Sequence, residues 1–446
     1  MKPSIPKGTR DFSPGQMRKR NYLFDIVREV FARYGYQPIE TPTLENLSTL
    51  TGKYGEEGDR LLFKVLNNGN FLEGADEQAL AARDAARLAP SIARRGLRYD
   101  LTVPFARFVV MYQHELSFPF KRYQIQPVWR ADRPQKGRYQ EFYQCDVDVV
   151  GSGSLMYEAE LTSIYDEVFA RLGLKVRILL NNRKILAGMA EVAGIAERFM
   201  DMTIAIDKLD KVGMEGVRKE LSERGIPDAG IDRIESLLGV QTLEAWKTAL
   251  AGSETGRKGI EELETVFAYL AETSQTNEVV FDPTLARGLS YYTGCIFEVR
   301  ALDVQMGSIG GGGRYDDLTG IFGLPNVSGV GVSFGAERIY DVMEELGLFP
   351  AKLSEDLTVL FVAFDEATHR YAFQCLSRTR AAGIAADLYP EPKKMEKQMK
   401  YANSRGVPFV VLIGSEEMES GLLTLKNMAS GEQGKHQLEA ILSLLR

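Results

Sequence analysis

The sequence predicts an α+β protein: a largely antiparallel sheet flanked by helices, interrupted by a helical insertion and followed by a small α/β domain. Three patterns support this prediction. Alternating apolar and polar residues around short polar loops predict paired strands, short helical segments broken by glycines fill residues 183–275, and strands alternate with helices after residue 356. At 446 residues the chain exceeds one ordinary core, which predicts two to four domains.

The same patterns set the expected domain boundaries. We expect the sheet domain in residues 1–182 and 276–345, the helical insertion in 183–275, a linker in 346–355 and the α/β domain in 356–446. The insertion would therefore split the sheet domain in sequence.

The first elements are predicted from the spacing of apolar residues. In residues 16–35 apolar side chains recur at three- and four-residue intervals before Gly35, which predicts an amphipathic helix, and strand-like residues 36–45 follow. The same spacing in residues 156–172, before Gly173, predicts a second helix. An alternating strand is expected over residues 174–182.

Residues 120–151 predict two paired strands around a polar loop. Tyr123 and Ile125 alternate with polar residues before the loop, and Val147 and Val149 do so after it. Such strands direct the polar side chains to one side of the sheet or the other, among them Arg130, Gln144, Asp146 and Asp148.

The remaining elements follow in order. Strand and turn character returns at 279–299, and a helix is expected from Ala336. Between them the glycine-dense residues 307–313 predict either a flexible turn or a backbone that passes close to a ligand. Strands at 357–364, 384–389 and 409–414, alternating with helices at 369–383 and 393–406, predict parallel pairs.

Composition limits the class of protein. The net charge of −7 argues against indiscriminate nucleic-acid binding, although a shaped nucleic acid could still meet local basic patches. No apolar run reaches the roughly 18 residues that span a bilayer, and the N-terminus lacks the apolar core of a signal peptide. Cys145, Cys295 and Cys375 are far apart, which favours a reducing compartment. We therefore expect a cytoplasmic protein without a membrane partner.

The segment around the polar loop carries a local excess of positive charge, although the chain as a whole is acidic. Between Lys121 and Arg138 a single acid, Asp132, stands against six cations: Lys121, Arg122, Arg130, Arg133, Lys136 and Arg138. Such a local reversal suggests an anionic ligand. A solvated surface hairpin with ordinary ion pairs explains the cations alone equally well, so both interpretations stay open at this point.

The sequence lacks the residue spacing that two common kinds of site require, the glycine-rich nucleotide sites and the zinc sites. There is no P-loop, and Gly329, Gly331 and Gly335 are spaced one residue too widely for a dinucleotide fingerprint. A zinc site finds little support, because the three histidines are scattered and neither HExxH nor CxxC occurs. We therefore expect no metal held by dedicated protein side chains.

A serine hydrolase is a weak alternative. Residues 331–335 match the G-x-S-x-G nucleophile elbow around Ser333, and two histidines lie downstream. An elbow needs the serine at a sharp turn from a strand into a helix, whereas the helix is expected from Ala336. The match therefore carries little weight.

Separated segments resemble the class II aminoacyl-tRNA synthetases. Residues 39–45 (IETPTLE) resemble motif 1, residues 129–132 (WRAD) with 142–144 resemble motif 2, and residues 329–338 (GVGVSFGAER) resemble motif 3. Residues 285–292 (LARGLSYY), 310–316 (GGGGRYD) and the opening 6–11 (PKGTRD) are similar to segments of the histidyl-tRNA synthetase family. The resemblance covers nearly the whole chain.

The resemblance implies a histidine–tRNA ligase whose chemistry rests on arginines. Arg130 and Arg287 are its expected catalytic residues, because positioned guanidinium groups stabilise the charge of phosphoryl transfer. The histidine-binding residues it implies are Asp100, Leu101, Thr102, Arg130, Gln144, Asp148, Arg287, Tyr291 and Tyr292. The ATP-binding residues it implies are Arg130, Asp132, Arg138, Phe142 and Arg338.

The resemblance also implies partners. ATP, L-histidine and tRNA(His) are the expected substrates, Mg²⁺ is expected with the nucleotide, and motif 1 implies a homodimer. The expected tRNA contacts are Arg133, Gln135, Lys136, Lys393 and Lys397. For the lysines, a solvated helix face is the open alternative.

Two features depart from the commonest bacterial pattern. Asp100 and Asp148 stand where many bacterial members carry glutamate, and Gln140 stands where many have arginine. A rival from another class is a non-catalytic, synthetase-like regulatory subunit of ATP phosphoribosyltransferase. Arg287, Arg338, the Tyr291–Tyr292 pair and the additional C-terminal domain speak against that rival.

Overall fold

The computed structural model describes residues 2–51, 60–240, 242–286, 291–350, 353 and 357–446. The chain divides into two compact units, Met1–Phe349 and Pro350–Arg446. The finer boundaries expected from the sequence remain a prediction.

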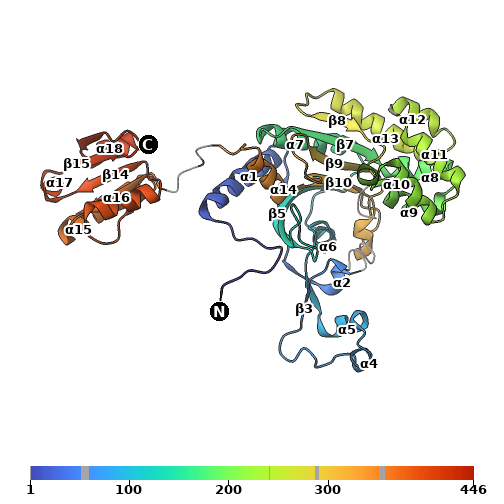
Figure 1. Ribbon diagram of the computed structural model, residues 1–446, viewed down its shortest axis with the longest axis horizontal. Coiled ribbons are helices and arrows are strands. Elements are labelled where there is room, and N and C mark those ends of the chain that lie inside the picture. The colour runs from blue at the N-terminus through green and yellow to red at the C-terminus, as the bar shows by residue number, and fades with distance from the viewer. Residues whose placement is uncertain (1, 52–59, 241, 287–290, 351–352, 354–356) are drawn as a thin grey trace. The chain divides into compact units, whose positions relative to one another are not determined.

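A large mixed sheet forms the centre of the first unit (Figure 1). Only the outer pairs β1–β5 and β7–β8 are parallel, so the sheet is largely antiparallel, as the sequence predicts. In spatial order its strands are β1 (Gln37–Pro38), β5 (Phe120–Trp129), β6 (Glu141–Val150), β11 (Gly329–Gly335), β10 (Gly310–Tyr315), β9 (Cys295–Ala301), β7 (Val176–Asn182) and β8 (Glu278–Phe281).

One face of this sheet is covered by helices α1 (Pro14–Arg33), α7 (Met156–Arg171) and α14 (Ala336–Glu345). Cys145, Val147 and Val149 of β6 are buried against these helices in the main hydrophobic core. Because side chains alternate along a strand, the residues between them point to the opposite face. That opposite face is polar and carries the candidate site.

Helix α6 (Thr102–Tyr112) lies over the polar face. Phe105 of α6 packs against Phe120 of β5, with ring centroids 6.3 Å apart, in a small second core that also contains Val150 and Tyr315. The 3₁₀ helix η2 (Leu318–Phe322) contributes to this core. The two faces of one sheet therefore differ in character: one packs mainly apolar side chains against the helices, and the other combines a small apolar core with buried polar groups.

A three-stranded sheet lies beside the large one. Residues 36–45 do not form the single strand that the sequence suggests, because Pro38 and Pro42 lack the N–H that a continuous strand needs. The segment instead supplies β1 to the large sheet and β2 to the small one. The small sheet and its helices are β2 (Leu44–Asn46), β4 (Arg95–Leu97), β3 (Lys64–Val65), α2 (Leu47–Leu50), α4 (Glu77–Ala81) and α5 (Ala85–Ile92).

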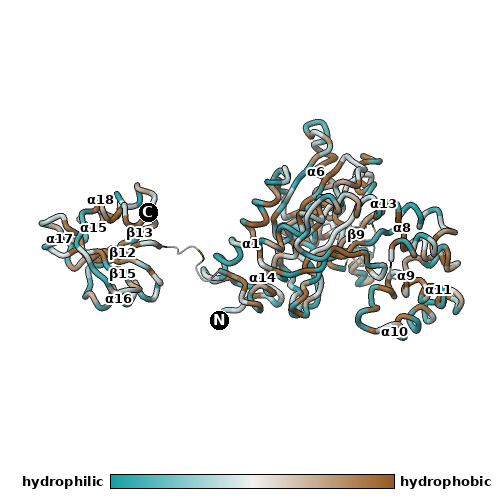
Figure 2. Tube along the Cα trace, turned by 90° about the horizontal axis from the view of Figure 1, so that it is seen from above, coloured by the Kyte–Doolittle hydropathy of each residue, from teal (hydrophilic) through white to brown (hydrophobic). Residues whose placement is uncertain are grey.

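Residues 183–275 are helical, as the sequence predicts. Their apolar side chains join the same core as the large sheet, and Trp246 packs edge-on against Phe281 of β8 at 6.1 Å. Figure 2 shows hydrophobic residues gathered inside this unit, with hydrophilic stretches along its outer helices. The elements are α8 (Arg183–Val192), η1 (Ala196–Arg198), α9 (Phe199–Ile206), α10 (Leu209–Glu223), α11 (Asp228–Leu238), α12 (Leu243–Ala249) and α13 (Glu254–Ala271).

The glycine-dense stretch is a strand, so the interpretation as a flexible turn is wrong. Residues 310–315 form β10, paired on both sides with β9 and β11. Glycine is required there because neighbouring groups approach closely: a Cβ on Gly310 would lie 2.8 Å from the ring of Tyr165, and one on Gly312 would lie 2.2 Å from the carbonyl oxygen of Gly331. A strand without side chains lets these groups pack against the sheet.

The second unit is an α/β domain with its own sheet, in the order β13-β12-β14-β15-β16. The first three strands are parallel, as predicted, and two antiparallel strands that the sequence analysis missed complete the sheet. Its elements are β12 (Val359–Ala363), α15 (Glu366–Ala381), β13 (Ala386–Leu388), α16 (Met395–Ser404), β14 (Phe409–Ile413), α17 (Ser415–Ser420), β15 (Leu423–Asn427), β16 (Gln433–His436) and α18 (Leu438–Leu444).

Candidate active site

The polar face of the large sheet brings six polar side chains together. The register of β5 and β6 places Arg122 opposite Asp148, Gln124 opposite Asp146, and Gln126 opposite Gln144. Arg122, Gln124, Asp146 and Asp148 are buried, which is unusual for polar residues in strands. A buried group of this kind, with more carboxylates than cations, indicates a site for a ligand that donates hydrogen bonds.

Asp148 forms an ion pair with Arg122 and accepts a hydrogen bond from Tyr315. Arg122 Nη2 lies 2.8 Å from Asp148 Oδ2, and the Tyr315 hydroxyl donates a hydrogen bond of 2.7 Å to Asp148 Oδ1. The guanidinium of Arg122 also lies 4.0 Å from the centre of the Phe105 ring on α6. Burial raises the pKa of Asp148, whereas Arg122 and Tyr315 lower it.

Asp146 is the less satisfied of the two carboxylates. Its Oδ1 is shielded from solvent and has no hydrogen-bond partner among the described residues. Burial raises the pKa of Asp146 to about 7; Arg122 opposes the shift, and the charge of Asp148 adds to it. Two acids two positions apart on one strand, sharing one arginine, titrate as a pair.

Two glycines make room for this arrangement. A Cβ on Gly331 of β11 would lie 1.9 Å from Asp148 Oδ1, and one on Gly313 of β10 would lie 2.7 Å from the Tyr292 ring. The rings of Tyr291 and Tyr292 are 4.7 Å apart and nearly perpendicular. Burial raises the pKa of Tyr292, and the charges of the nearby acids raise it further. Tyr292 and Asp148 thus lie near one another, and their expected role in binding histidine stays a prediction.

The start of α6 contributes a third carboxylate. Asp100 is buried, and its Oδ1 accepts a hydrogen bond of 3.3 Å from the backbone N–H of Val103. Leu101 is buried beside it, and Thr102 is the first residue of the helix. The charge of Asp100 raises the pKa of Asp146, so the two carboxylates lie near one another.

Arg130 lies at the end of β5, beside this third carboxylate. Its Nε donates a hydrogen bond of 2.9 Å to the carbonyl oxygen of Tyr99, and its guanidinium lies 5.1 Å from the centre of the Phe142 ring. Its terminal nitrogens make no hydrogen bond to the described residues, which leaves a fork suited to an oxyanion.

Gln144 and Ser333 link β6 to β11. Gln144 Nε2 donates a hydrogen bond of 3.1 Å to the Ser333 hydroxyl, while the Gln144 Oε1 is buried without a donor in the described part of the chain. Ser333 lies inside β11, and helix α14 begins only at Ala336. Ser333 is therefore not at the apex of a strand-to-helix turn, and the geometry of a nucleophile elbow is not met.

The loop between β5 and β6 is fastened by arginines. Arg338 donates 2.7 Å from Nε to the carbonyl oxygen of Gly137 and 2.6 Å from Nη1 to that of Ser308. Arg10, from the N-terminal segment, donates 2.9 Å to Asp341, and its guanidinium lies 3.7 Å from the Tyr139 ring. These contacts hold the loop against helix α14.

The remaining loop residues expected from the sequence differ in exposure. Arg133 and Gln135 are exposed, and Lys136 is exposed in an ion pair of 3.0 Å with Glu345. Asp132 and Arg138 are half-buried.

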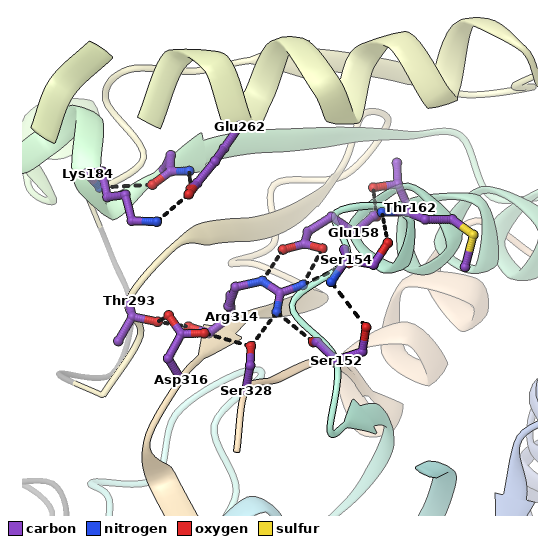
Figure 3. Close-up of polar contacts among 12 residues, drawn as sticks. Ser152, Ser154, Glu158, Thr162, Lys184, Glu262, Thr293, Arg314, Asp316 and Ser328 are labelled. Carbon is purple, nitrogen blue, oxygen red and sulfur yellow. Dashed lines mark hydrogen bonds and ion pairs between the residues drawn. The ribbon is translucent and has the colours of Figure 1, made fainter. Parts of the chain in front are cut away.

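Arg314, in the glycine-rich segment, anchors the fold (Figure 3). Its guanidinium pairs with both carboxylate oxygens of Glu158 on α7, at 2.5 and 2.7 Å, and donates to the carbonyl oxygens of Ser152 and Ser154 and the hydroxyl of Ser328. Arg314 and Glu158 are buried. The arginine therefore fixes β10 against α7 and the loop after β6.

The structure does not place three expected site residues relative to this site. Arg287 lies outside the described residues. Lys393 and Lys397 belong to the second unit, and the expectation that both lie on one helix is wrong: α16 begins at Met395, so Lys393 precedes it and pairs with Glu391 at 3.0 Å.

The structure adds residues that the sequence analysis did not assign to the site. These are Arg122, Gln124, Asp146 and Tyr315. The alternation of Gln144, Asp146 and Asp148 along one strand is the signal that could have included Asp146.

The described residues contain no group of three histidine, cysteine or acidic side chains that could hold a metal ion. Within those residues, no helix is long and apolar enough to cross a membrane.

The antiparallel sheet, its buried polar face and the three motif segments define a class II aminoacyl-tRNA synthetase. The family profile described as Histidyl-tRNA synthetase matches residues 8–72 and 70–339, and that described as Anticodon binding domain matches residues 356–446. A protein of Phocaeicola vulgatus named Histidine--tRNA ligase is 55% identical over 450 residues, covering 100% of this chain and 99% of its own length. The chain therefore belongs to the histidyl-tRNA synthetase family.

Further similar proteins and solved structures support the same family assignment. A Bacteroides fragilis protein named Histidine--tRNA ligase is 56% identical over 449 residues, covering 100% of this chain and 99% of its own length. The histidyl-tRNA synthetase structure from a Nostoc species has a TM-score of 0.82 at 28% identity, covering 100% of this chain and 99% of that one. A Bacillus halodurans structure titled as an ATP phosphoribosyltransferase regulatory subunit/histidyl-tRNA synthetase has a TM-score of 0.74 at 21% identity, covering 92% and 98%. At that identity the comparison shows the fold alone.

Proposed function

We propose that this enzyme joins L-histidine to tRNA(His) in two steps. An oxygen of the histidine carboxylate attacks the α-phosphorus of ATP; the bond from that phosphorus to the pyrophosphate group breaks, which yields histidyl-adenylate and free pyrophosphate. The 3′-terminal ribose hydroxyl of the tRNA then attacks the acyl carbon, and AMP leaves. The full-length identity of 55% with a protein named Histidine--tRNA ligase carries this proposal over the regulatory-subunit and hydrolase alternatives.

Arg130 is the proposed contact to the α-phosphate and to the histidine carboxylate. Its side chain is fixed at one end by the Tyr99 carbonyl and by the Phe142 ring, which leaves the terminal nitrogens to bind oxyanions. A preorganised guanidinium stabilises the charge that develops at phosphorus without reorganising during the reaction. On the family resemblance, Arg287 is the second such group.

The histidine pocket is proposed to be the polar face of the sheet. Asp100 and Thr102 would bind the ammonium group, with Leu101, Gln144, Asp148, Tyr291 and Tyr292 around the remainder of the amino acid. An amino acid lacking matching donors would leave these buried groups unpaired. A site built on such hydrogen bonds rejects unmatched ligands by several orders of magnitude.

Asp132, Arg138, Phe142 and Arg338 are the proposed contacts to ATP. Arg338 fastens the loop through the carbonyls of Gly137 and Ser308, so its contribution to nucleotide binding includes holding that loop in place. The described residues do not fit a dedicated metal cage; Mg²⁺ carried on the phosphate oxygens of ATP needs few protein ligands.

The tRNA is proposed to contact both units. Arg133, Gln135 and Lys136 on the β5–β6 loop would meet its acceptor end, and the second unit would bind the anticodon with Lys393 and Lys397 as phosphate contacts. The exposure of these side chains is compatible with such contacts. We also propose a homodimer, on the motif 1 resemblance.

The proposal is tested with purified protein. Histidine-dependent exchange between ATP and pyrophosphate tests the first step, and charging of tRNA(His) tests the second. Exchange that does not depend on histidine, or that several amino acids support equally, would contradict the proposed function.

A further inference from the structure

The N-terminal segment, residues 8–12, lies on the β5–β6 loop although the two are far apart in sequence. The carbonyl oxygen of Gly8 accepts a hydrogen bond of 2.8 Å from the backbone N–H of Gln140. Gln140 accepts 2.9 Å at its own carbonyl from the backbone N–H of Arg130, and its side chain donates 3.0 Å to the carbonyl of Asp132. One residue, Gln140, therefore connects the N-terminal segment to two of the proposed ATP contacts.

The first contact of this segment requires glycine. Gly8 has a φ of +82°, and a Cβ on it would lie 2.7 Å from Gln140 Cγ and 3.1 Å from Pro134 Cγ. Glycine adopts this backbone conformation without steric cost. Pro134 and Gln140 belong to opposite limbs of the loop, so the segment packs against both limbs.

Arg10 connects the loop to helix α14. Its Nη1 donates 3.0 Å to the Tyr139 hydroxyl and 2.9 Å to Asp341 Oδ1, and the Tyr139 hydroxyl donates 2.6 Å to Asp341 Oδ2. The other terminal nitrogen, Nη2, is buried without an acceptor among the described residues, so the guanidinium depends on its stacking over the Tyr139 ring, 3.7 Å away. Burial and Asp341 raise the pKa of Tyr139 to about 12, which keeps its hydroxyl a donor at neutral pH.

Phe12 anchors the other end of the segment. The Arg20 guanidinium lies 4.0 Å from the centre of its ring, and the ring of Tyr340 is edge-on to it at 6.4 Å. Arg20 is itself fixed by a buried ion pair of 2.8 Å with Glu337. Glu337 and Tyr340 lie within one turn of Arg338 on α14, so the segment is tied to the helix that carries a further proposed ATP contact.

We propose that Arg10 is a positioning residue for ATP binding, which acts by holding the β5–β6 loop against α14. The proposal rests on the proposed function and goes beyond it, because Arg10 acts through the loop rather than on a substrate. The loop carries Asp132 and Arg138, and α14 carries Arg338. A loop that is already ordered costs less free energy to bind a ligand than one that the ligand must order.

A role in stability alone predicts a different result. The side chains of Arg10 and Asp341 are 25% and 17% exposed, so their ion pair should contribute little to the stability of the first unit. Loss of Arg10 should therefore weaken ATP binding without a matching fall in the melting temperature.

The test uses three variants of the full chain. Arg10→Ala removes the contacts, and Arg10→Lys keeps the charge but not the planar fork. Arg224→Ala is the matched control: Arg224 is 29% exposed and pairs with Asp201 at 3.0 Å and with Glu220 at 2.8 Å, all within the helical segment 183–275. Thermal unfolding, calorimetric titration with ATP alone, and ATP–pyrophosphate exchange are measured for each variant.

Arg10→Ala should weaken ATP binding about tenfold and raise the KM for ATP equally, as expected when hydrogen bonds to a charged group are lost. The KM for histidine should change less than about threefold, since most of the proposed histidine contacts lie on the sheet and at the start of α6, away from the loop. Arg10→Lys should give intermediate values, and Arg224→Ala should match the wild type.

Two outcomes would overturn the inference. One is ATP affinity unchanged in Arg10→Ala; the other is an equal rise in both KM values together with a lowered melting temperature, which would make Arg10 a support of the fold only. Should Arg10→Ala fail to fold, Tyr139→Phe provides the same comparison, because it keeps the ring under Arg10 and removes the hydroxyl. A wild-type protein without histidine-dependent exchange would instead refute the proposed function, whereas the titration with ATP needs no amino acid, so the two failures are distinguishable.

Discussion

Arg122 and Asp148 occupy directly opposed positions on β5 and β6 and form an ion pair of 2.8 Å, with side-chain exposures of 0% and 4%. Almost every other ion pair described in the chain is more exposed. Burial makes such a pair costly to break, because the remaining charge has no water to solvate it. The pair therefore connects the stability of the sheet to the shape of the candidate histidine pocket.

Replacing this arginine should destabilise the first unit. Arg122→Leu leaves Asp146 and Asp148 buried without their shared cation, so we expect a loss of about 3–5 kcal/mol and a clear fall in the melting temperature. Arg177→Leu is the matched control, because Arg177 forms an exposed pair with Glu278 and its loss should cost about 0–1 kcal/mol. Differential scanning calorimetry checks both, and equal losses would contradict the role of the buried pair.

The acids of the polar face predict a pH dependence of stability. The folded state holds the proton of Asp146 more tightly than the unfolded chain does, because burial and Asp148 raise its pKa to about 7 against the opposing effect of Arg122. Its stabilising contribution is therefore complete below pH about 4 and is lost as the pH rises through about 7. Asp100 and Ser333 also act on this group.

Asp146→Asn removes this titration. The melting temperature of the variant, measured relative to that of the wild type, should increase between pH 5 and pH 8. A difference that stays constant over this range would show that Asp146 titrates near its ordinary pKa.

Two glycines of β10 give a matched pair of substitutions. A Cβ on Gly313 would lie 2.7 Å from the Tyr292 ring, whereas the nearest atom to one on Gly311 is the carbonyl oxygen of Phe297 at 3.3 Å. Gly313→Ala should therefore displace Tyr292 and raise the KM for histidine about tenfold or more, the cost of about 1–3 kcal/mol expected from overpacking. Gly311→Ala should have a much smaller effect in the same exchange assay. Similar values for the two variants would argue against a role for Tyr292 in the pocket.

The prediction for Arg287 rests on the sequence. Arg287→Ala should reduce histidyl-adenylate formation well over tenfold, since removing one charge-stabilising donor costs about 3 kcal/mol in the transition state. Histidine affinity, measured by calorimetry, should change little, because the main effect is on the transition state. Near-normal exchange would remove Arg287 from the catalytic residues.

The fold was largely predictable from local patterns, since each pattern reports on one element. The alternation around residues 120–151 predicted β5 and β6 because one face of both strands is apolar and packs against helices. The glycine-rich strand β10 was harder to predict from the sequence. Its glycines are needed because rings and carbonyl groups from other elements occupy the space that side chains on this strand would fill.

Predicting the full site would have required the register of the strands, that is, which residues of neighbouring strands lie opposite each other. Asp148 and Tyr292 were expected together from the family resemblance, and the structure brings them to one face. The partners of Asp148, Arg122 and Tyr315, come from strands far apart in sequence, and no local pattern pairs them. Among the residues that the structure describes, Asp146 is the acid of this strand whose Oδ1 is buried without a hydrogen-bond donor.

The central claim is that the buried polar face selects histidine for activation by ATP. ATP–pyrophosphate exchange by the purified full chain, measured with each amino acid in turn, tests it most directly. We predict exchange with L-histidine that exceeds every other amino acid by several orders of magnitude, because buried groups left unpaired reject ligands without matching donors. Exchange supported equally by several amino acids, or none with histidine, would contradict the claim.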